Sequence, residues 1–194
     1  QGPRGTLDRI LSINDPLRRG DEFRLLLDRL EAEDFAAFIE AFRQDGLHRE
    51  NPGEYRMALY VWAQKDPLGA LAYTRENTRG GWSSRQVLSA WAQYDLVAAE
   101  NWALANHDGE GANPWLIGVI DGIASVDLNN ATRLLNQLPY SRERGEALNS
   151  LIDSVGKLEL DDAVAWLDEL GDERLKKGAL ERLADSLGRR HGAA

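Results

Sequence analysis

Two stretches of this sequence share one pattern: LYVWAQKDPLGALAY at residues 59–73 and LSAWAQYDLVAAENW at residues 88–102. Each contains Trp-Ala-Gln, an aspartate two positions later, and an alanine four positions after that aspartate. Self-similarity at a fixed spacing is typical of repeat proteins. The two copies therefore indicate an internal repeat.

The first half of the pattern recurs six times. An apolar pair opens each copy, and a large apolar residue follows four positions after the first member of the pair. These large residues are Leu30, Trp62, Trp91, Ile123, Val155 and Leu183, and a small residue follows each of them except Leu30. The copies are 32, 29, 32, 32 and 28 residues apart. Positions i, i+1, i+4 and i+5 share one helical face, so each copy predicts an amphipathic helix.

A second block follows in the four middle copies. It begins with an acidic residue, has an alanine four positions later, and has a large residue three positions further on. The large residues are Tyr73, Trp102, Leu134 and Trp166. Small residues opposite large ones let two helices approach closely and interlock. The repeat is thus a helical hairpin, and hairpins that cannot bury their apolar stripes alone stack into an α-solenoid.

We therefore expect an all-α fold, a right-handed α-solenoid of about five helical hairpins with a repeat of roughly 30 residues. Residues 1–194 form a single domain in this interpretation. A short N-terminal helix at residues 6–13 precedes repeats that run from about residue 16 to residue 188. No strand is expected, because no alternation of apolar and polar residues occurs outside the helical patterns.

Three aspartates of the pattern are predicted to be structural. Asp66 precedes Pro67, and proline is favoured at the first position of a helix. An aspartate placed there accepts hydrogen bonds from the free amides of the first turn. We interpret Asp66, Asp95 and Asp127 as N-caps of the second helix in their hairpins. The alternative, a catalytic or metal-binding carboxylate, needs partner groups that converge on it.

The tryptophans fall into two groups. Trp62 and Trp91 interchange with aliphatic residues in the repeat, and Trp102 and Trp166 alternate with tyrosine and leucine. Such interchange indicates packing positions in the core. Trp82 and Trp115 lie instead at joints between repeats, and they are interpreted as staples onto the following helix or as ligand-facing rings. Ser83-Ser84 is a candidate cap beside Trp82, which would then staple onto Val87 or Leu88.

Composition excludes several classes of function. The chain is 43% hydrophobic and 28% charged, as in globular proteins, and its net charge of −9 would repel a nucleic acid. There is no cysteine, so disulfides, thiolate metal sites and cysteine nucleophiles are excluded. No apolar run reaches the roughly 18 residues of a membrane span. The compartment stays open: cytoplasmic, or the cell envelope if an upstream signal or anchor was removed.

No motif of catalysis or of cofactor binding is found. His48 and His107 fall in predicted joints and His191 in the tail, where a lone histidine is usually solvated. The loop at residues 107–111, HDGEG, has a carboxylate pair but lacks the spacing of a calcium loop. Phosphate-binding and nucleophile-elbow motifs are missing as well. No cofactor and no metal is expected.

The repeats resemble those of bacterial α-solenoid proteins that carry W-A-x-x-D-P-x-x-A units. More loosely they are similar to tetratricopeptide, Sel1-like and HEAT-like arrays. This resemblance spans roughly residues 16–188. It implies a binding scaffold for a peptide or another protein, and it transfers no catalytic residue.

Three hypotheses on function follow. In the first, the chain is a non-enzymatic scaffold that binds a basic or neutral protein segment. Its candidate contacts are aromatic and arginine side chains expected to be exposed near the joints: Tyr55, Tyr60, Tyr94, Trp82, Arg75 and Arg79. In the second, it is an all-α hydrolase or glycan-processing domain with carboxylates converging on the concave face. In the third, it is a supporting segment of a longer array.

Overall fold

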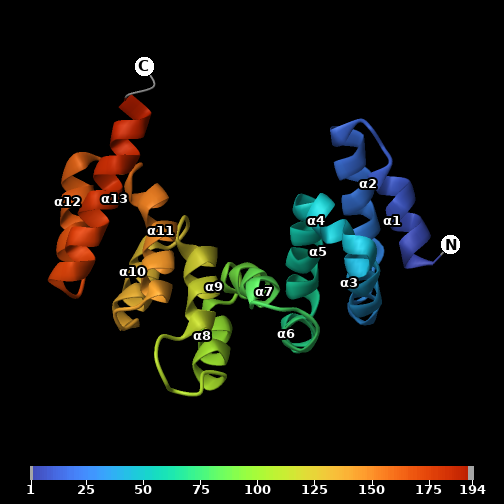
Figure 1. The fold of residues 1–194 in the computed structure, drawn as a ribbon, viewed down its shortest axis with the longest axis horizontal. Helices are drawn as coiled ribbons and strands as arrows, with labels where there is room; N and C mark the ends of the chain where they lie inside the picture. The colour runs from blue at the N-terminus through green and yellow to red at the C-terminus, as the bar shows by residue number, and fades with distance from the viewer. Residues whose placement is uncertain (1, 192–194) are drawn as a thin grey trace. The chain divides into compact units, whose positions relative to one another are not determined.

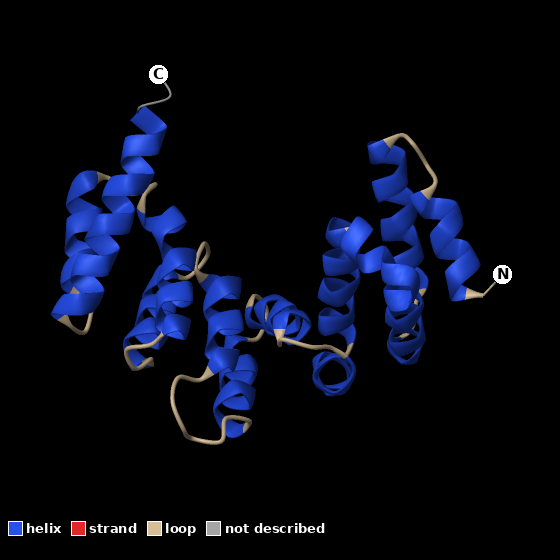
Figure 2. Ribbon diagram, in the orientation of Figure 1, coloured by secondary structure: helices blue, strands red, loops and turns tan. Residues whose placement is uncertain are grey.

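The structure, a computed structural model, describes residues 2–191, except for the side chains of residue 45 and residues 187–191. Within these residues there are thirteen α-helices and two short 3-10 helices, and no strand (Figures 1 and 2). The prediction of an all-α fold is confirmed. Helices of nine to fourteen residues joined by short turns are the rule, as hairpin repeats require.

The chain divides into two compact units. The N-terminal unit is Gln1–Trp91 and the C-terminal unit is Ala92–Ala194. The boundary falls at the end of a helix, α7, and not in a linker. Each unit has its own buried core of apolar side chains.

The N-terminal unit contains seven α-helices. Their bounds are α1 Pro3–Leu11, α2 Pro16–Arg29, α3 Phe35–Arg43, α4 Leu47–Glu50, α5 Pro52–Lys65, α6 Pro67–Asn77 and α7 Trp82–Ala92. The 3-10 helices η1 Ala32–Asp34 and η2 Gln44–Gly46 flank α3. The N-terminal helix, predicted at residues 6–13, begins and ends earlier in the structure. Pro3 stands at its first position, and Ser12 is its C-cap. Proline likewise starts α2, α5 and α6.

Aromatic packing holds the N-terminal unit together. Helix α3 packs on α1, α5 and α6, and α2 packs on α1 and α5. Phe23, Phe38 and Phe42 form a cluster with ring centroids 5.9–6.2 Å apart. Trp62 of α5 is buried and stacks on Phe35, with the ring centroids 5.9 Å apart. Trp62 therefore occupies a core position, as its interchange with aliphatic residues predicts.

The C-terminal unit contains α8 Leu96–Ala105, α9 Pro114–Ile123, α10 Leu128–Gln137, α11 Arg142–Val155, α12 Leu160–Asp168 and α13 Glu173–His191. Helix α11 packs between α9 and α13 (Figure 1). Helices α8 and α10 pack on α9, α10 also contacts α11, and α12 packs on α13. Trp166 of α12 is buried, and its indole Nε1 donates a hydrogen bond to Thr132 Oγ1 of α10 over 2.8 Å.

Several hydrogen bonds join helices that are about 33 residues apart in the sequence. The hydroxyl of Tyr73 donates to Glu40, 33 residues earlier. Arg133 binds Glu100 through both terminal nitrogens, also 33 residues apart, and Trp166 and Thr132 are 34 residues apart. These separations are one or two residues longer than the longest step of 32 residues between sequence copies, and each contact joins two helices of the same unit.

The three aspartates of the pattern cap helices. Asp66 accepts a hydrogen bond from Gly69 N over 2.9 Å at the start of α6. Asp95 accepts from Ala98 N over 3.0 Å at the start of α8. Asp127 accepts from the backbone and side-chain nitrogens of Asn130 over 3.1 and 2.7 Å at the start of α10. The predicted capping role of these residues is therefore present in the structure.

Candidate functional site

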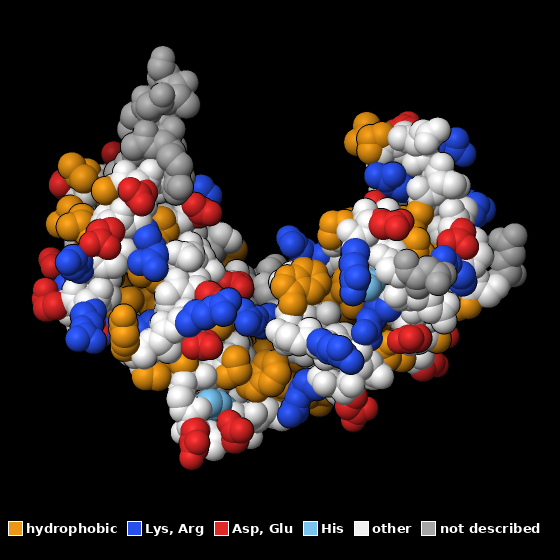
Figure 3. Space-filling view, in the orientation of Figure 1, with side chains coloured by type: hydrophobic (Ala, Val, Ile, Leu, Met, Phe, Trp, Pro, Cys, Tyr) orange, Lys and Arg blue, Asp and Glu red, His pale blue; other side chains and the backbone are white. Residues whose placement is uncertain are grey.

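A cleft of about 710 Å³ lies within the N-terminal unit, where α3 ends, α4 and α5 begin, and the α6–α7 joint passes. We call it the Trp82 cleft. Its lining residues are Arg43, His48, Arg49, Tyr55, Asn77, Thr78, Arg79, Trp82 and Ser83. In the space-filling view, Lys and Arg side chains lie beside exposed hydrophobic groups in the region of α4, α5 and α7 (Figure 3).

Two glycines bring Trp82 to the edge of the cleft. Gly80 and Gly81 have φ angles of 78° and 71°, in the left-handed region that only glycine adopts at little cost. They turn the chain sharply after α6, so that α7 begins at Trp82 itself. Ser83 and Ser84 thus lie inside the helix, and the prediction that they precede and cap it is wrong.

Buried hydroxyls fix the start of α7 in place. The oxygens of Ser83 and Tyr55 lie 3.3 Å apart at hydrogen-bond distance, and those of Ser84 and Thr74 lie 2.9 Å apart. All four residues are buried. Polar pairs in a dry environment have few alternative partners, so they hold α5, α6 and α7 in one arrangement.

Trp82 is a partly exposed aromatic residue on a rigid support. Its side chain is 42% exposed, and its ring stacks on that of Tyr55 at 15° with the centroids 6.2 Å apart. Arg56 lies over the indole, 5.9 Å from the ring centroid. Tyr55 is itself buried against Phe42. An indole held in this way loses little conformational freedom when a ligand covers it.

The polar lining of the Trp82 cleft is cationic. Arg43, Arg49 and Arg79 contribute three guanidinium groups, and none of the lining residues described is a carboxylate. Burial, with the charges of Arg49 and Arg43, holds the pKa of His48 below its usual range, so the imidazole is neutral at neutral pH. Its buried Nδ1 has no hydrogen-bond partner among the described residues. The local field thus favours an anionic ligand, although the whole chain is acidic.

The structure brings together three of the six predicted contact residues, Tyr55, Arg79 and Trp82. Tyr55 is only 3% exposed, so the expectation that it is an exposed contact is wrong: it packs against aromatic rings and forms the floor. Tyr60 lies half-buried on α5 and Arg75 is exposed on α6, both outside the cleft. Tyr94 is 49% exposed and belongs to the C-terminal unit.

Three lining residues with basic side chains are missing from the predicted contacts: Arg43, His48 and Arg49. They come from the end of α3 and from the short helix α4, which interrupts the first repeat. His48 was expected in a solvated joint, but it is half-buried and its ring lies 5.4 Å from that of Tyr55. The available signal was three basic side chains within residues 43–49 of an otherwise acidic chain.

The other tryptophans are packing residues. Trp91 is 7% exposed. Trp102 and Trp115 pack edge to face with centroids 5.8 Å apart, and Trp115 Nε1 donates to Asn106 O over 3.2 Å. Trp115 therefore joins α9 to the preceding helix α8, and not to a helix that follows it.

The carboxylates singled out in the sequence serve other roles. Asp66, Asp95 and Asp127 accept hydrogen bonds from helix amides. Hydrogen bonds from Asn130 lower the pKa of Asp127, which is the opposite of what a general acid needs. Among the described residues, no group of three or more His, Cys, Asp and Glu side chains is arranged to hold a metal ion.

Comparison with known proteins adds no functional assignment: no protein family, no characterised protein and no solved structure matches the chain. Of the helices described, none combines the length and the apolar character needed to cross a membrane.

Proposed function

We propose that this chain is a non-enzymatic helical-repeat scaffold, an α-solenoid of about five hairpins, that binds a segment of a partner protein in the Trp82 cleft. The repeat copies and the contacts at 33 and 34 residues support the solenoid. The observation that carries the binding role is Trp82, a partly exposed indole stacked on a buried ring at the edge of a cationic cleft.

The chemistry of the Trp82 cleft favours an acidic segment with an apolar residue. The net charge of −9 suggests a basic or neutral partner, but Arg43, Arg49 and Arg79 are the charges closest to a bound ligand. Guanidinium groups form paired hydrogen bonds with carboxylates, and an indole provides apolar contact area. We expect carboxylates near Arg49 and Arg79 and an apolar side chain on Trp82.

The test is selection of peptides from a random displayed library on the immobilised full chain. Trp82→Ala serves as the comparison, and circular dichroism checks that it folds. Selection on the wild type should enrich acidic segments that carry an aromatic or aliphatic residue. A central tryptophan contact is a frequent hot spot, so Trp82→Ala should weaken their binding about 30-fold.

Charge variants separate a cleft from general attraction. Arg49→Gln and Arg79→Gln should each weaken an enriched peptide about tenfold, as expected for loss of one charge-assisted hydrogen bond. Arg18→Gln is the matched control, because Arg18 is an exposed arginine of the same unit outside the cleft. Equal loss of peptide affinity in Arg49→Gln, Arg79→Gln and Arg18→Gln would refute the proposal. So would a selection in which the wild type enriches no peptides beyond those that Trp82→Ala enriches.

A further inference from the structure

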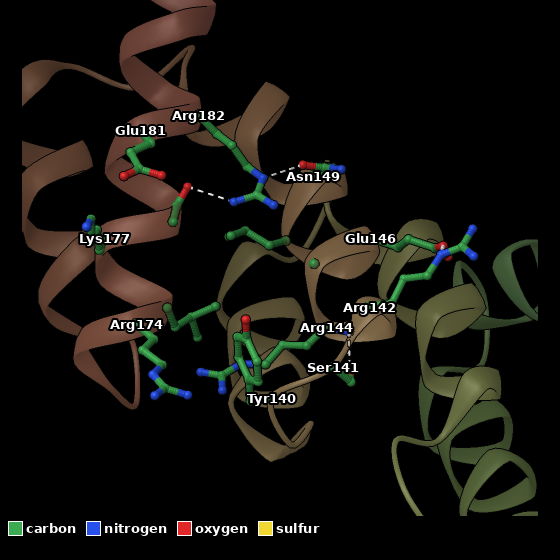
Figure 4. A pocket seen from close by; sticks show the side chains of 14 residues that line it. Tyr140, Ser141, Arg142, Arg144, Glu146, Asn149, Arg174, Lys177, Glu181 and Arg182 are labelled. Atoms are coloured by element: carbon green, nitrogen blue, oxygen red, sulfur yellow. Dashed lines mark hydrogen bonds and ion pairs between the residues drawn. The ribbon is translucent and has the colours of Figure 1, made fainter.

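A second cleft, of about 540 Å³, lies wholly within the C-terminal unit, between α11 and α13 (Figure 4). We call it the Arg182 cleft. Five basic side chains line it, Arg142, Arg144, Arg174, Lys177 and Arg182, together with two carboxylates, Glu146 and Glu181. Leu148 and Leu175 also line it, and both are buried. The cleft therefore has an apolar floor and a cationic wall.

Two of the five cations are neutralised within the protein. Arg142 pairs with Glu146 over 2.9 Å on the exposed side of α11. Arg144 is 7% exposed and pairs with Asp172, whose pKa this hydrogen bond lowers. Arg174, Lys177 and Arg182 form no salt bridge with any described residue. Of the two acids in the lining, Glu146 pairs with Arg142, which leaves Glu181 beside these three cations. A net positive charge is left facing the cleft.

Arg182 is held in one position by its neighbours. Its Nε donates to Asn149 Oδ1 over 2.7 Å, and its Nη1 donates to the carbonyl of Gly178 over 2.9 Å (Figure 4). The guanidinium lies over Gly178, where an added Cβ would come within 3.0 Å of Nη1. Glycine weakens a helix relative to alanine, and at position 178 it leaves the Arg182 guanidinium in unstrained contact with the backbone. A pre-positioned donor loses little entropy on binding.

A second cationic group lies at the other end of the Arg182 cleft. Arg174 packs over the ring of Tyr140, 5.1 Å from its centroid, and Tyr140 is 76% exposed at the rim. Figure 4 shows Arg174, Arg144 and Tyr140 near one another, and Arg182 with Asn149 further along α11 and α13. The cations are thus spread along the cleft and do not converge on one point. This spacing suits several anionic groups on one chain better than a single compact anion.

We propose that the Arg182 cleft is a binding site for an acidic peptide segment. The carboxylates of the bound peptide pair with Arg182 and Arg174, and the aliphatic carbons of the peptide cover Leu148 and Leu175. The site belongs to the C-terminal unit and does not depend on the Trp82 cleft. The geometry and charge that carry the proposal come from α11, α13 and the Tyr140 joint alone.

The test is a titration of the ¹⁵N-labelled full chain with hexaglutamate, followed by NMR. The amides of Gly145 and Gly178, which line this cleft, should shift and report an affinity for it. The indole N–H of Trp82 reports the other cleft separately. Arg182→Gln should weaken binding at the glycine amides about tenfold. Lys157→Gln, an equal charge change on an exposed residue outside the lining, should change it less than twofold.

A glycine pair separates positioning from charge. Gly178→Ala displaces the Arg182 guanidinium without removing a charge, so it should weaken hexaglutamate about fivefold while the helix content is kept. Gly20→Ala is the matched control, because Gly20 lies inside α2, outside the lining, with open space around an added Cβ, and it should bind like the wild type. The Gly145 amide is the reporter for Gly178→Ala.

Three outcomes would overturn the proposal. The first is the lack of any shift at Gly145 and Gly178 up to millimolar hexaglutamate. The second is equal binding by Arg182→Gln and Lys157→Gln, which would indicate general charge attraction. The third is saturation of the same shifts by inorganic phosphate at the concentration that hexaglutamate needs, which would indicate a site for a small anion.

Discussion

Removal of the Asp127 cap provides a quantitative test of how helix α10 is held. The Asp127 carboxylate accepts two hydrogen bonds from Asn130, over 3.1 Å from the backbone nitrogen and 2.7 Å from the side-chain nitrogen. Both would be lost in Asp127→Ala. Loss of an N-cap costs about 1 kcal/mol, and the second bond brings the expected loss to about 1.5 kcal/mol. In Asp127→Asn the amide oxygen still caps, so the loss should stay below about 0.5 kcal/mol.

Urea denaturation followed by circular dichroism measures this difference. With a slope of about 2 kcal/mol per M, Asp127→Ala should lower the midpoint by roughly 0.5–1 M without a change of slope. Asp153→Ala is the matched control, because Asp153 is an exposed carboxylate on α11 with no capping role. Equal midpoints for Asp127→Ala and Asp127→Asn, or for Asp127→Ala and Asp153→Ala, would refute the capping argument.

The effect has a defined pH dependence. Hydrogen bonds from Asn130 lower the pKa of Asp127 in the folded state below the ordinary value of 3.8. The stabilisation is therefore complete above the unfolded-state pKa, and it is lost as pH falls through the lower folded-state pKa. The difference in stability between wild type and Asp127→Ala should be constant near neutral pH and should shrink only below about pH 4. A difference that vanishes near pH 6 would contradict this origin.

Three further perturbations test other features. Burial and the hydrogen bond to Glu40 raise the pKa of Tyr73 to about 12. An absorbance titration at 295 nm should therefore show a late tyrosine ionisation, which Tyr73→Phe removes. The stability that this hydrogen bond provides should be lost as pH rises from 10 to 12. Thr132→Val leaves the buried indole N–H of Trp166 without its acceptor, so the free energy of unfolding measured in urea should fall by about 1–3 kcal/mol. In a Trp166→Phe background, which lacks this N–H, the same substitution should cost much less. Gly81→Ala, at a φ of 71°, should destabilise the protein by about 1 kcal/mol. Gly20→Ala, inside α2 with open space around it, should stabilise the protein by about 0.5–1 kcal/mol. Equal thermal midpoints for the two variants would contradict the roles given to these two glycines.

Much of the fold could be predicted because packing and capping leave regular marks. The apolar pairs recur at the repeat spacing, and Trp62 and Trp166 stand where aliphatic residues stand in other copies. An aspartate before a proline, as at Asp66, has a local reason that needs no tertiary structure. Burial of these positions and capping by these aspartates are local or periodic properties, so a single sequence is enough to find them.

Most of the lining of the two clefts could not be predicted, because those residues follow no period. His48 and Arg49 come from a short helix inserted between two repeat helices, and Arg79 reaches the same cleft from a joint 30 residues later. The two Gly residues before Trp82 decide which way its ring points. At the second cleft, Arg182 and Asn149 meet across α13 and α11, and their contact depends on the rotation of each helix. The spacing of the sequence pattern predicts which helices pack together, but it does not predict how each helix is rotated about its own axis.

The hydrogen bonds between helices also have a consequence for the kinetics of folding. Those of Tyr55, Tyr73, Arg133, Trp166 and Arg182 join residues 28 to 34 positions apart, a small part of a chain of 194 residues. Each of these contacts closes a loop of roughly thirty residues, and a loop of this length costs little entropy to close. Because each contact needs only a short preceding part of the chain, native structure can form stepwise while the polypeptide is still leaving the ribosome.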